Sequence, residues 1–374
     1  MRLHISFVIV LCLTTIAAVH AQKYRAPSVN IGDPAPPMRV YSWIKGTPVN
    51  IFEKGNIYVV DLWATWCQPC IAEMPRLSAL ARKYRGHVTV LGVDVLERKT
   101  TTLRKIKTFV DSMGAQMDYN VIMADSGQIE KDWLSATEEM GIPTTFIVDR
   151  EGRLGWMGHP CDNFEDALSK IVNGSWDINK ALAKRNLEFR LRNLEDSLKE
   201  QLEFAPNGNY RNDSWKRDSA LLLVDEVAKA EPLVKYTPMV ASQIFSTLLK
   251  TNTKKAYEYG KEVLETTTYE KPAGFIISGA IERLSSEINF PPEIYQLGLD
   301  AIQVELDEVL SCYPEIRKVY KHYYKRAKWY GVLGNKSKAV EALEKAIEIM
   351  KSQNDYLETD LALCEAWLKQ YKKM

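Results

Sequence analysis

The chain has 374 residues, of which 46% are hydrophobic and 26% are charged, with 49 Lys and Arg against 48 Asp and Glu. This length predicts two or three domains, and the composition is that of an ordinary globular protein with enough apolar side chains for a core. Six cysteines are too few for a disulfide scaffold, and a formal net charge of +1 gives no electrostatic reason to expect a nucleic-acid partner.

The first residues predict a secretory signal peptide. Arg2 supplies a positive start, residues 5–18 are apolar, and Val19-His20-Ala21 fits the small-x-small cleavage rule. About 14 apolar residues are fewer than the roughly 20 that span a bilayer, so we expect cleavage after Ala21 rather than an anchor. The protein would then work in the periplasm or elsewhere outside the cytoplasm, where disulfides persist.

From residue 26 to about residue 174, strand-like and helix-like segments alternate. We expect strands over 57–64, 88–95, 121–123, 144–148 and 154–157, and helices over 71–84, 103–113, 129–140 and 163–172. The run 57–64 is apolar except for Asp61, as in a strand buried on both faces. Residues 149–152 predict a hairpin turn in which Gly152 takes a positive φ. This order indicates a central mixed sheet with helices on both faces.

After Trp176 the strand signals stop, and amphipathic helices follow one another. A long charged helix over 178–204 precedes three helix centres, at 255–264, 294–302 and 338–347, whose spacing of about 40 residues suggests stacked helix pairs. The last unit places its small and packing residues as a tetratricopeptide-like repeat does, at Ala327, Tyr330, Gly334, Ala339, Leu343 and Ala346. It lacks the closing proline of that repeat, so an irregular helical bundle is the alternative. The predicted domains are a signal peptide at 1–21, an α/β domain at 22–174 and an α-helical domain at 175–374.

Cys67 and Cys70 form a Cys-x-x-Cys motif where the strand 57–64 meets the helix 71–84. Unpaired N–H groups and the positive end of the helix dipole stabilise a thiolate at Cys67. Cys70 returns to the same helix face, so Cys67 can attack a foreign disulfide and Cys70 can resolve the mixed disulfide. A zinc site would need further ligands at suitable spacing, and haem attachment would need His in place of Ile71. We therefore predict a redox-active disulfide that needs no separate cofactor and no metal.

Residues 26–174 resemble the thioredoxin-fold domain of TlpA/ResA-type proteins, which are exported thiol–disulfide oxidoreductases. The resemblance rests on four motifs: Asn30-Ile31-Gly32-Asp33-Pro34-Ala35-Pro36, Trp66-Cys67-Gln68-Pro69-Cys70, Pro75, and Gly141-Ile142-Pro143-Thr144-Thr145-Phe146. It implies a thioredoxin-like α/β fold, followed here by an all-α helical-repeat or bundle domain. It also implies that Pro143 is cis and faces the disulfide, and that the backbone at Ile142 pairs with substrate. Trp66 and Pro69 would border the same substrate surface, with an ordinary buried tryptophan as the alternative for Trp66.

Two carboxylates are further candidates. In related proteins a carboxylate at the position of Asp61, with a pKa raised by its apolar site, moves a proton for the second cysteine. The alternative is a solvated side chain at a strand edge. Glu73 matches a glutamate that ResA-type proteins place near the cysteines, although Glu early in a helix is favourable in any case.

The loop after the last strand holds weaker candidates. His159 could contact substrate or tune the thiolate, or it could be an inert loop histidine. Cys161 lies near the same rim, either as a third redox thiol or as a partly buried free cysteine. Cys312 and Cys364 could form a bridge, but no sequence argument brings them together.

These patterns predict an exported thiol–disulfide oxidoreductase that acts on exported proteins bearing disulfides or thiols. The resemblance favours a reductant that receives electrons from a membrane thiol donor. A peroxidase is disfavoured, because the attacking cysteine of peroxiredoxins follows Thr by three residues and Pro by seven, where Ala64 and Val60 stand here. The alternative from another class is a protein-binding scaffold, in which the helical domain holds a protein partner and the redox domain is auxiliary.

Overall fold

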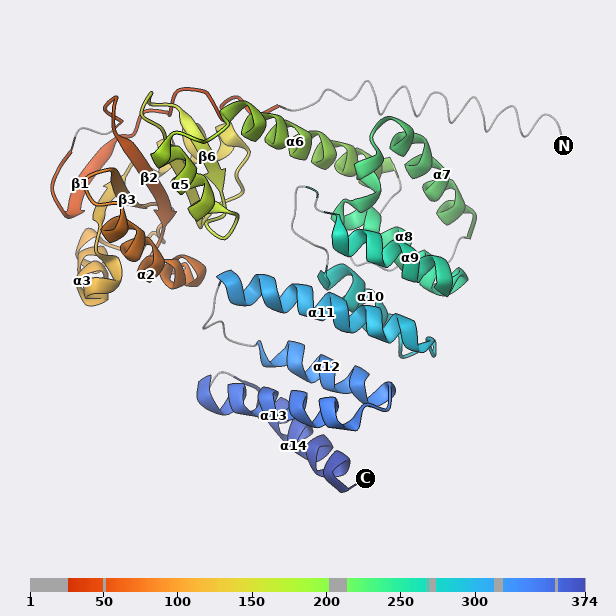
Figure 1. The fold of residues 1–374 in the computed structure, drawn as a ribbon. Coiled ribbons are helices and arrows are strands. Elements are labelled where there is room, and N and C mark those ends of the chain that lie inside the picture. Colours follow the sequence, from red (N-terminus) through yellow and green to blue (C-terminus); the bar gives the residue numbers. More distant parts are fainter. Residues whose placement is uncertain are drawn as a thin grey trace, which may run out of the picture. The chain divides into compact units, whose positions relative to one another are not determined.

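The computed structural model describes residues 26–49, 52–201, 214–266, 268, 274–312, 319–353 and 356–373. The chain divides between Asn186 and Leu187 into two compact units, which we call the α/β unit (Ala26–Asn186) and the helical unit (from Leu187 on). The strands lie in the first unit and the long helix series in the second (Figure 1). The predicted signal peptide, residues 1–21, lies outside the described residues. Among the helices that are described, none combines the length and the apolar character that a bilayer crossing requires.

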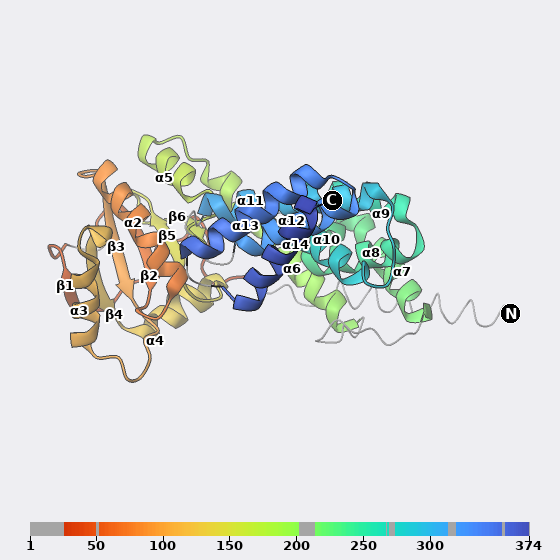
Figure 2. The same cartoon turned by 90° about the horizontal axis from the view of Figure 1, so that it is seen from below.

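The α/β unit is built on one six-stranded mixed sheet of order β1-β4-β3-β2-β5-β6 (Figure 2). The strands are β1 (Val40–Lys45), β2 (Ile57–Trp63), β3 (Val88–Asp94), β4 (Asn120–Ala124), β5 (Thr144–Val148) and β6 (Leu154–Gly158). Strand β3 pairs in parallel with β2 and β4, whereas β1, β5 and β6 pair antiparallel with their neighbours. All seven residues of β2 are buried, which explains its continuous apolar run.

Helices cover both faces of this sheet. They are α2 (Gln68–Lys83), α3 (Leu103–Met113), α4 (Ser126–Ile129) and α5 (Phe164–Asn173), with short helical turns η1 (Gly114–Met117) and η2 (Glu130–Ser135). On one face Val59 and Trp63 of β2 belong to a core shared with α2, α3 and α5. On the other face Val60 and Leu62 pack with η2 and, at its edge, with the start of the helix α6 (Ile178–Gln201). The predicted mixed sheet with flanking helices is therefore confirmed.

Some local elements differ from the prediction. Strand β1 was not expected, because its residues are only partly buried and its pairing with β4 is irregular, so no clean alternation marks it. The helix expected over 129–140 begins earlier, because Asp125 caps α4 by accepting from the N–H groups of Gly127 and Gln128 at 3.0 and 3.1 Å. It then continues as the π-helical turn η2.

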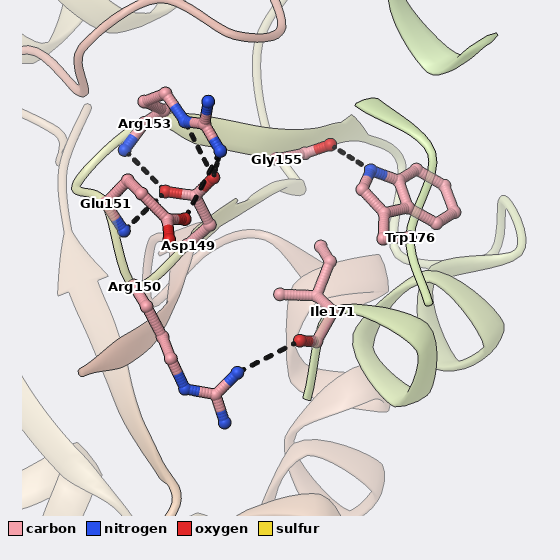
Figure 3. A network of polar contacts seen from close by, with 7 residues as sticks. All are labelled: Asp149, Arg150, Glu151, Arg153, Gly155, Ile171 and Trp176. Carbon is pink, nitrogen blue, oxygen red and sulfur yellow. Dashed lines mark hydrogen bonds and ion pairs between the residues drawn. The ribbon is translucent and has the colours of Figure 1, made fainter. Parts of the chain in front are cut away.

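The turn between β5 and β6 is held by a carboxylate network (Figure 3). Asp149 Oδ1 accepts from the backbone N–H groups of Glu151 and Arg153 at 3.0 and 2.9 Å, and Asp149 Oδ2 accepts from Arg153 Nε and Nη2 at 3.0 and 2.9 Å. Arg150 donates to the carbonyl of Ile171 at the end of α5. The predicted turn is confirmed, with Gly152 at φ +79°.

The boundary between the units lies inside α6 (Ile178–Gln201), twelve residues beyond the predicted domain limit at 174. The first turns of α6 belong to the α/β unit because Arg185 donates to the carbonyl of Thr137 at 2.9 Å and pairs with Glu139 at 2.6 Å. Asn186 accepts from Asn30 at 3.0 Å in the same unit. Because the boundary lies inside one continuous helix, the amino-acid composition does not change there, and the sequence gives no sign of it.

The helical unit is a series of helices in chain order (Figure 1). After α6 they are α7 (Ser214–Ala230), η3 (Pro232–Tyr236), α8 (Pro238–Thr251), α9 (Thr253–Glu265), α10 (Gly274–Leu284), α11 (Pro292–Cys312), α12 (Tyr320–Val332), α13 (Lys336–Gln353) and α14 (Glu358–Lys373). Consecutive helices pack as pairs: α8 with α9, α10 with α11, and α12 with α13. A Cβ on Gly298 of α11 would lie 2.4 Å from the Trp329 ring of α12, so a close contact joins successive pairs. The tetratricopeptide-like assignment stays a prediction.

We expect Asp149→Ala to lower the free energy of unfolding of the α/β unit by about 2–3 kcal/mol, because it removes two backbone acceptors and the arginine partner of the turn. Asp166→Ala is a matched control, since its exposed pair with Lys170 is worth about 0.5 kcal/mol or less. Urea unfolding followed by hydrogen exchange of β5 and β6 measures both variants. Equal losses in the two would contradict this account of the turn.

Candidate active site

Cys67 and Cys70 form a disulfide at the junction of β2 and α2. Their Cα atoms are 5.3 Å apart. Cys67 is the N-cap of α2, and its sulfur accepts from the Cys70 N–H at 3.3 Å. The helix begins at Gln68, three residues earlier than predicted, because the cysteine itself caps it. The sulfur of Cys67 therefore lies at the positive end of the helix dipole, where a thiolate is stabilised.

Asp61 lies in the middle of β2, fully buried on the face that α2 covers. The Thr145 hydroxyl donates to Asp61 Oδ1 at 2.7 Å, whereas Asp61 Oδ2 has no partner among the described residues. Burial raises the pKa of Asp61 to about 7, against the lowering effect of the Thr145 hydrogen bond. The charges of Glu73 and Arg76 also act on this carboxyl, so it lies beneath the first turns of α2. The solvated strand-edge alternative is excluded.

Glu73 is buried on α2 and paired with Arg76, whose Nε donates to Glu73 Oε2 at 2.8 Å. Burial raises the pKa of Glu73, and the Arg76 charge opposes that shift. Arg76 also donates to the carbonyl of Pro160 and lies 3.5 Å from Glu165. This arginine thus links α2 to the loop after β6 and to α5. Sequence reasoning missed Arg76, although its i,i+3 spacing from Glu73 was a usable signal.

Four of the five predicted substrate contacts belong to two segments: the residues next to the cysteines at the start of α2, and the cis peptide that precedes β5. The Ile142–Pro143 peptide bond is cis, as the resemblance implies, and it precedes β5, whose Thr144 pairs with Leu62 near the end of β2. Pro69 is exposed in the first turn of α2. Trp66 is 41% exposed, so it is not an ordinary buried tryptophan. Their roles in substrate binding stay predictions.

The loop after β6 carries the remaining candidates. His159 is half-buried, and its Nδ1 accepts from the Cys161 N–H at 3.3 Å, a contact that holds the loop rather than the disulfide. Cys161 is disulfide-bonded, so it is not the partly buried free cysteine considered above, whereas a role as a third redox thiol stays a prediction. Its sulfur lies 3.6 Å from Glu73 Oε1.

Cys364 in the helical unit is free and buried, so the bridge to Cys312 is not formed. Burial raises the pKa of the Cys364 thiol to about 11, which leaves it protonated at neutral pH. The side chain of Cys312 lies outside the described residues. In the part of the chain that is described, no cluster of three His, Cys, Asp or Glu side chains is placed to hold a metal ion.

A second buried carboxyl, Asp94 at the end of β3, was not predicted. It is 2% exposed, and burial together with the neighbouring Glu97 raises the pKa of Asp94 to about 8. Asp94 is the register partner of Trp63, next to the redox motif. Its signal in the sequence resembled that of Asp61: a carboxylate within an apolar run, here at the end of the strand rather than in its middle.

We expect Asp61→Asn to raise the free energy of unfolding of the α/β unit at pH 8 by about 2–4 kcal/mol, with little change at pH 4. The folded state holds the Asp61 proton up to about pH 7, whereas the unfolded chain releases it near 3.8. Between these values the folded state binds more protons, so wild-type stability falls as the pH rises, and the variant escapes this loss.

Urea unfolding at both pH values, followed by hydrogen exchange of β2, measures this difference within the α/β unit. Asp111→Asn, an exposed carboxylate on α3, is the matched control and should behave as wild type at both pH values. If the difference in unfolding free energy between Asp61→Asn and the wild type does not increase from pH 4 to pH 8, the raised pKa of Asp61 is contradicted.

Parts of the chain are similar to known proteins. A family model described as the AhpC/TSA family matches residues 31–157. Protein FixW of Rhizobium leguminosarum is 31% identical over 163 residues, which are 40% of this chain and 70% of that protein. Thiol-disulfide oxidoreductase ResA of Bacillus anthracis is 29% identical over 34% of this chain and 68% of that protein. StoA from Bacillus subtilis, a solved structure, is 20% identical, with a TM-score of 0.29 over 34% of this chain and 90% of that chain.

The fold is assigned from the strand order and the helices on both faces of the sheet, and the activity from the relatives together with the Cys67–Cys70 disulfide. The matched segment of the family model lies within the α/β unit. The chain therefore belongs to the thioredoxin-fold thiol–disulfide oxidoreductases of the TlpA/ResA type.

Proposed function

We propose that this enzyme works outside the cytoplasm as a reductant of disulfides in exported proteins. The observation that carries the proposal is the placement of the Cys67–Cys70 disulfide at a helix start, over the buried carboxyl of Asp61. The direction of electron flow follows the family resemblance, with a membrane thiol donor as the source of electrons. The redox-active disulfide serves as the only cofactor in this proposal.

In the proposed cycle the Cys67 thiolate attacks one sulfur of a substrate disulfide. A mixed disulfide forms, and the other substrate sulfur leaves as a thiolate that takes up a proton. Cys70 loses its proton to Asp61, and its thiolate attacks the Cys67 sulfur. The second substrate thiol is released, and the Cys67–Cys70 disulfide is restored. Two electrons have passed to the substrate, and the donor dithiol returns them.

Asp61 suits the role of proton acceptor, because a carboxyl with a pKa of about 7 is partly ionised at neutral pH. Glu73 is proposed to assist through its charge, which acts on the Asp61 carboxyl. Trp66, Pro69, Ile142 and Pro143 are proposed to bind the substrate backbone and side chains around the disulfide. His159 is proposed to contact substrate at the rim of this surface.

The helical unit is proposed to hold a protein partner. Its consecutive helix pairs support this, because stacked pairs commonly present an extended binding surface. We place no nucleic acid among the partners, since the charge of the whole chain is balanced.

We expect Cys70→Ser to accumulate mixed disulfides on Cys67, because the resolving thiolate is gone. Non-reducing separation of exported proteins, followed by mass spectrometry, identifies the trapped substrates. Cys364→Ser is the matched control, since it removes a buried, protonated thiol of the helical unit and should trap nothing. If Cys70→Ser traps nothing and the wild type does not reduce a model disulfide, the scaffold alternative replaces this proposal.

We expect the mature chain to begin at Gln22 when it is produced in a cell that exports it. Intact-mass measurement and N-terminal sequencing of the extracytoplasmic fraction give the result. Ala21→Arg should keep the leader attached, because it breaks the small-x-small rule. Recovery of the wild type with Met1 intact in the cytoplasm would contradict the proposed location.

A further inference from the structure

The segment that follows β3 holds the turn that precedes Cys67. Glu97 Oε1 accepts from the Thr65 backbone N–H at 2.5 Å, and Glu97 Oε2 accepts from the Thr65 hydroxyl at 3.0 Å. The indole N–H of Trp66 donates to the Leu96 carbonyl at 2.9 Å. Both residues between Ala64 and Cys67 are thus attached to the 96–97 segment.

Glu97 also lies near a buried carboxyl. Asp94, at the end of β3, is 2% exposed, and burial together with the neighbouring Glu97 raises the pKa of Asp94 to about 8. Glu97 itself accepts from both donors of Thr65, so its carboxyl group faces the turn before Cys67.

Leu96 adds backbone strain at the same place. Its φ is +54°, a left-handed conformation that a leucine rarely adopts. The Ser126 hydroxyl accepts from the Leu96 N–H at 3.3 Å and helps to keep this conformation. Strain of this kind persists where the surrounding contacts require it, and here it aims the Leu96 carbonyl at the Trp66 indole.

We propose that Glu97 is a positioning residue for the redox pair: by its two hydrogen bonds to Thr65 it fixes the Thr65–Trp66 turn and so favours closure of the Cys67–Cys70 disulfide over the dithiol. A fixed turn keeps the two sulfurs near each other and reduces the conformational entropy lost on closure. The Glu97 charge also disfavours a thiolate at Cys67, which acts in the same direction. This inference rests on the proposed roles of Cys67 and Cys70.

The test measures the equilibrium of the purified full-length chain with reduced and oxidised glutathione at pH 7. We expect Glu97→Ala to shift the dithiol–disulfide equilibrium about tenfold toward the dithiol, because both Thr65 contacts and the charge are lost. Glu97→Gln keeps an oxygen acceptor for Thr65 and should shift the equilibrium less, about threefold. Asp111→Asn removes an exposed carboxylate of the same unit and should match the wild type.

Thr65→Val tests the Thr65–Glu97 contact from the other residue, and it can be used if Glu97→Ala does not fold. It removes the hydroxyl and keeps the N–H, so we expect a shift of about threefold. In the double variant with Glu97→Ala, the Thr65 change should add nothing further, because its partner is already gone. A purely structural role would lower the unfolding free energy without moving the equilibrium constant.

Two results overturn the inference. If the wild-type pair exchanges with glutathione while folded Glu97→Ala and Thr65→Val stay within twofold of it, the inference alone fails. If the wild-type pair does not exchange at all, the proposed roles of Cys67 and Cys70 fail, and this inference fails with them.

Discussion

A carboxyl group in the middle of an apolar strand is the constraint around which the site is arranged. Asp61 lies in β2, which is buried along its whole length, and a charge there is costly to desolvate. One hydroxyl, that of Thr145 on the neighbouring strand, offsets part of that cost. The pKa of this carboxyl therefore lies close to physiological pH, so gaining or losing a proton there costs little free energy. The proton transfer proposed for Cys70 requires an acceptor whose pKa lies close to the ambient pH.

The turn before the cysteines is held by the segment that follows β3. Glu97 accepts from the Thr65 N–H and hydroxyl, and the Leu96 carbonyl accepts from the Trp66 indole. Strand β3 lies beside β2 in the sheet, so this restraint follows from the strand order. The helix dipole of α2 acts on the Cys67 sulfur, but it does so usefully only if the turn before that sulfur stays in place.

Features with a strong local pattern could be predicted from the sequence. The buried run of β2, the Cys-x-x-Cys motif and the turn at Gly152 each depend on residues close together in the chain. The features that were missed depend on contacts distant in the chain. Arg76 contacts Pro160 and Glu165, which lie far from it in the chain. Glu97 accepts a hydrogen bond from Thr65, 32 residues earlier. The boundary at Asn186 was missed for a related reason, because the contacts of Arg185 and Asn186 divide a helix that looks continuous in sequence.

Two buried carboxyls with raised pKa values lie on one face of the sheet, and they affect the electrostatics of thiolate chemistry. The pKa of Asp61 is about 7 and that of Asp94 about 8, so each carries less negative charge at neutral pH than an exposed carboxylate would. When the disulfide opens, a thiolate on Cys70 would meet a carboxyl that still carries a proton, and the two groups would titrate as a coupled pair. A proton can then move between the Cys70 sulfur and the Asp61 carboxyl, so that only one of the two buried groups is negatively charged at a time. Glu97, by contrast, acts through hydrogen bonds, because it accepts from the backbone N–H and the hydroxyl of Thr65 in the turn before Cys67.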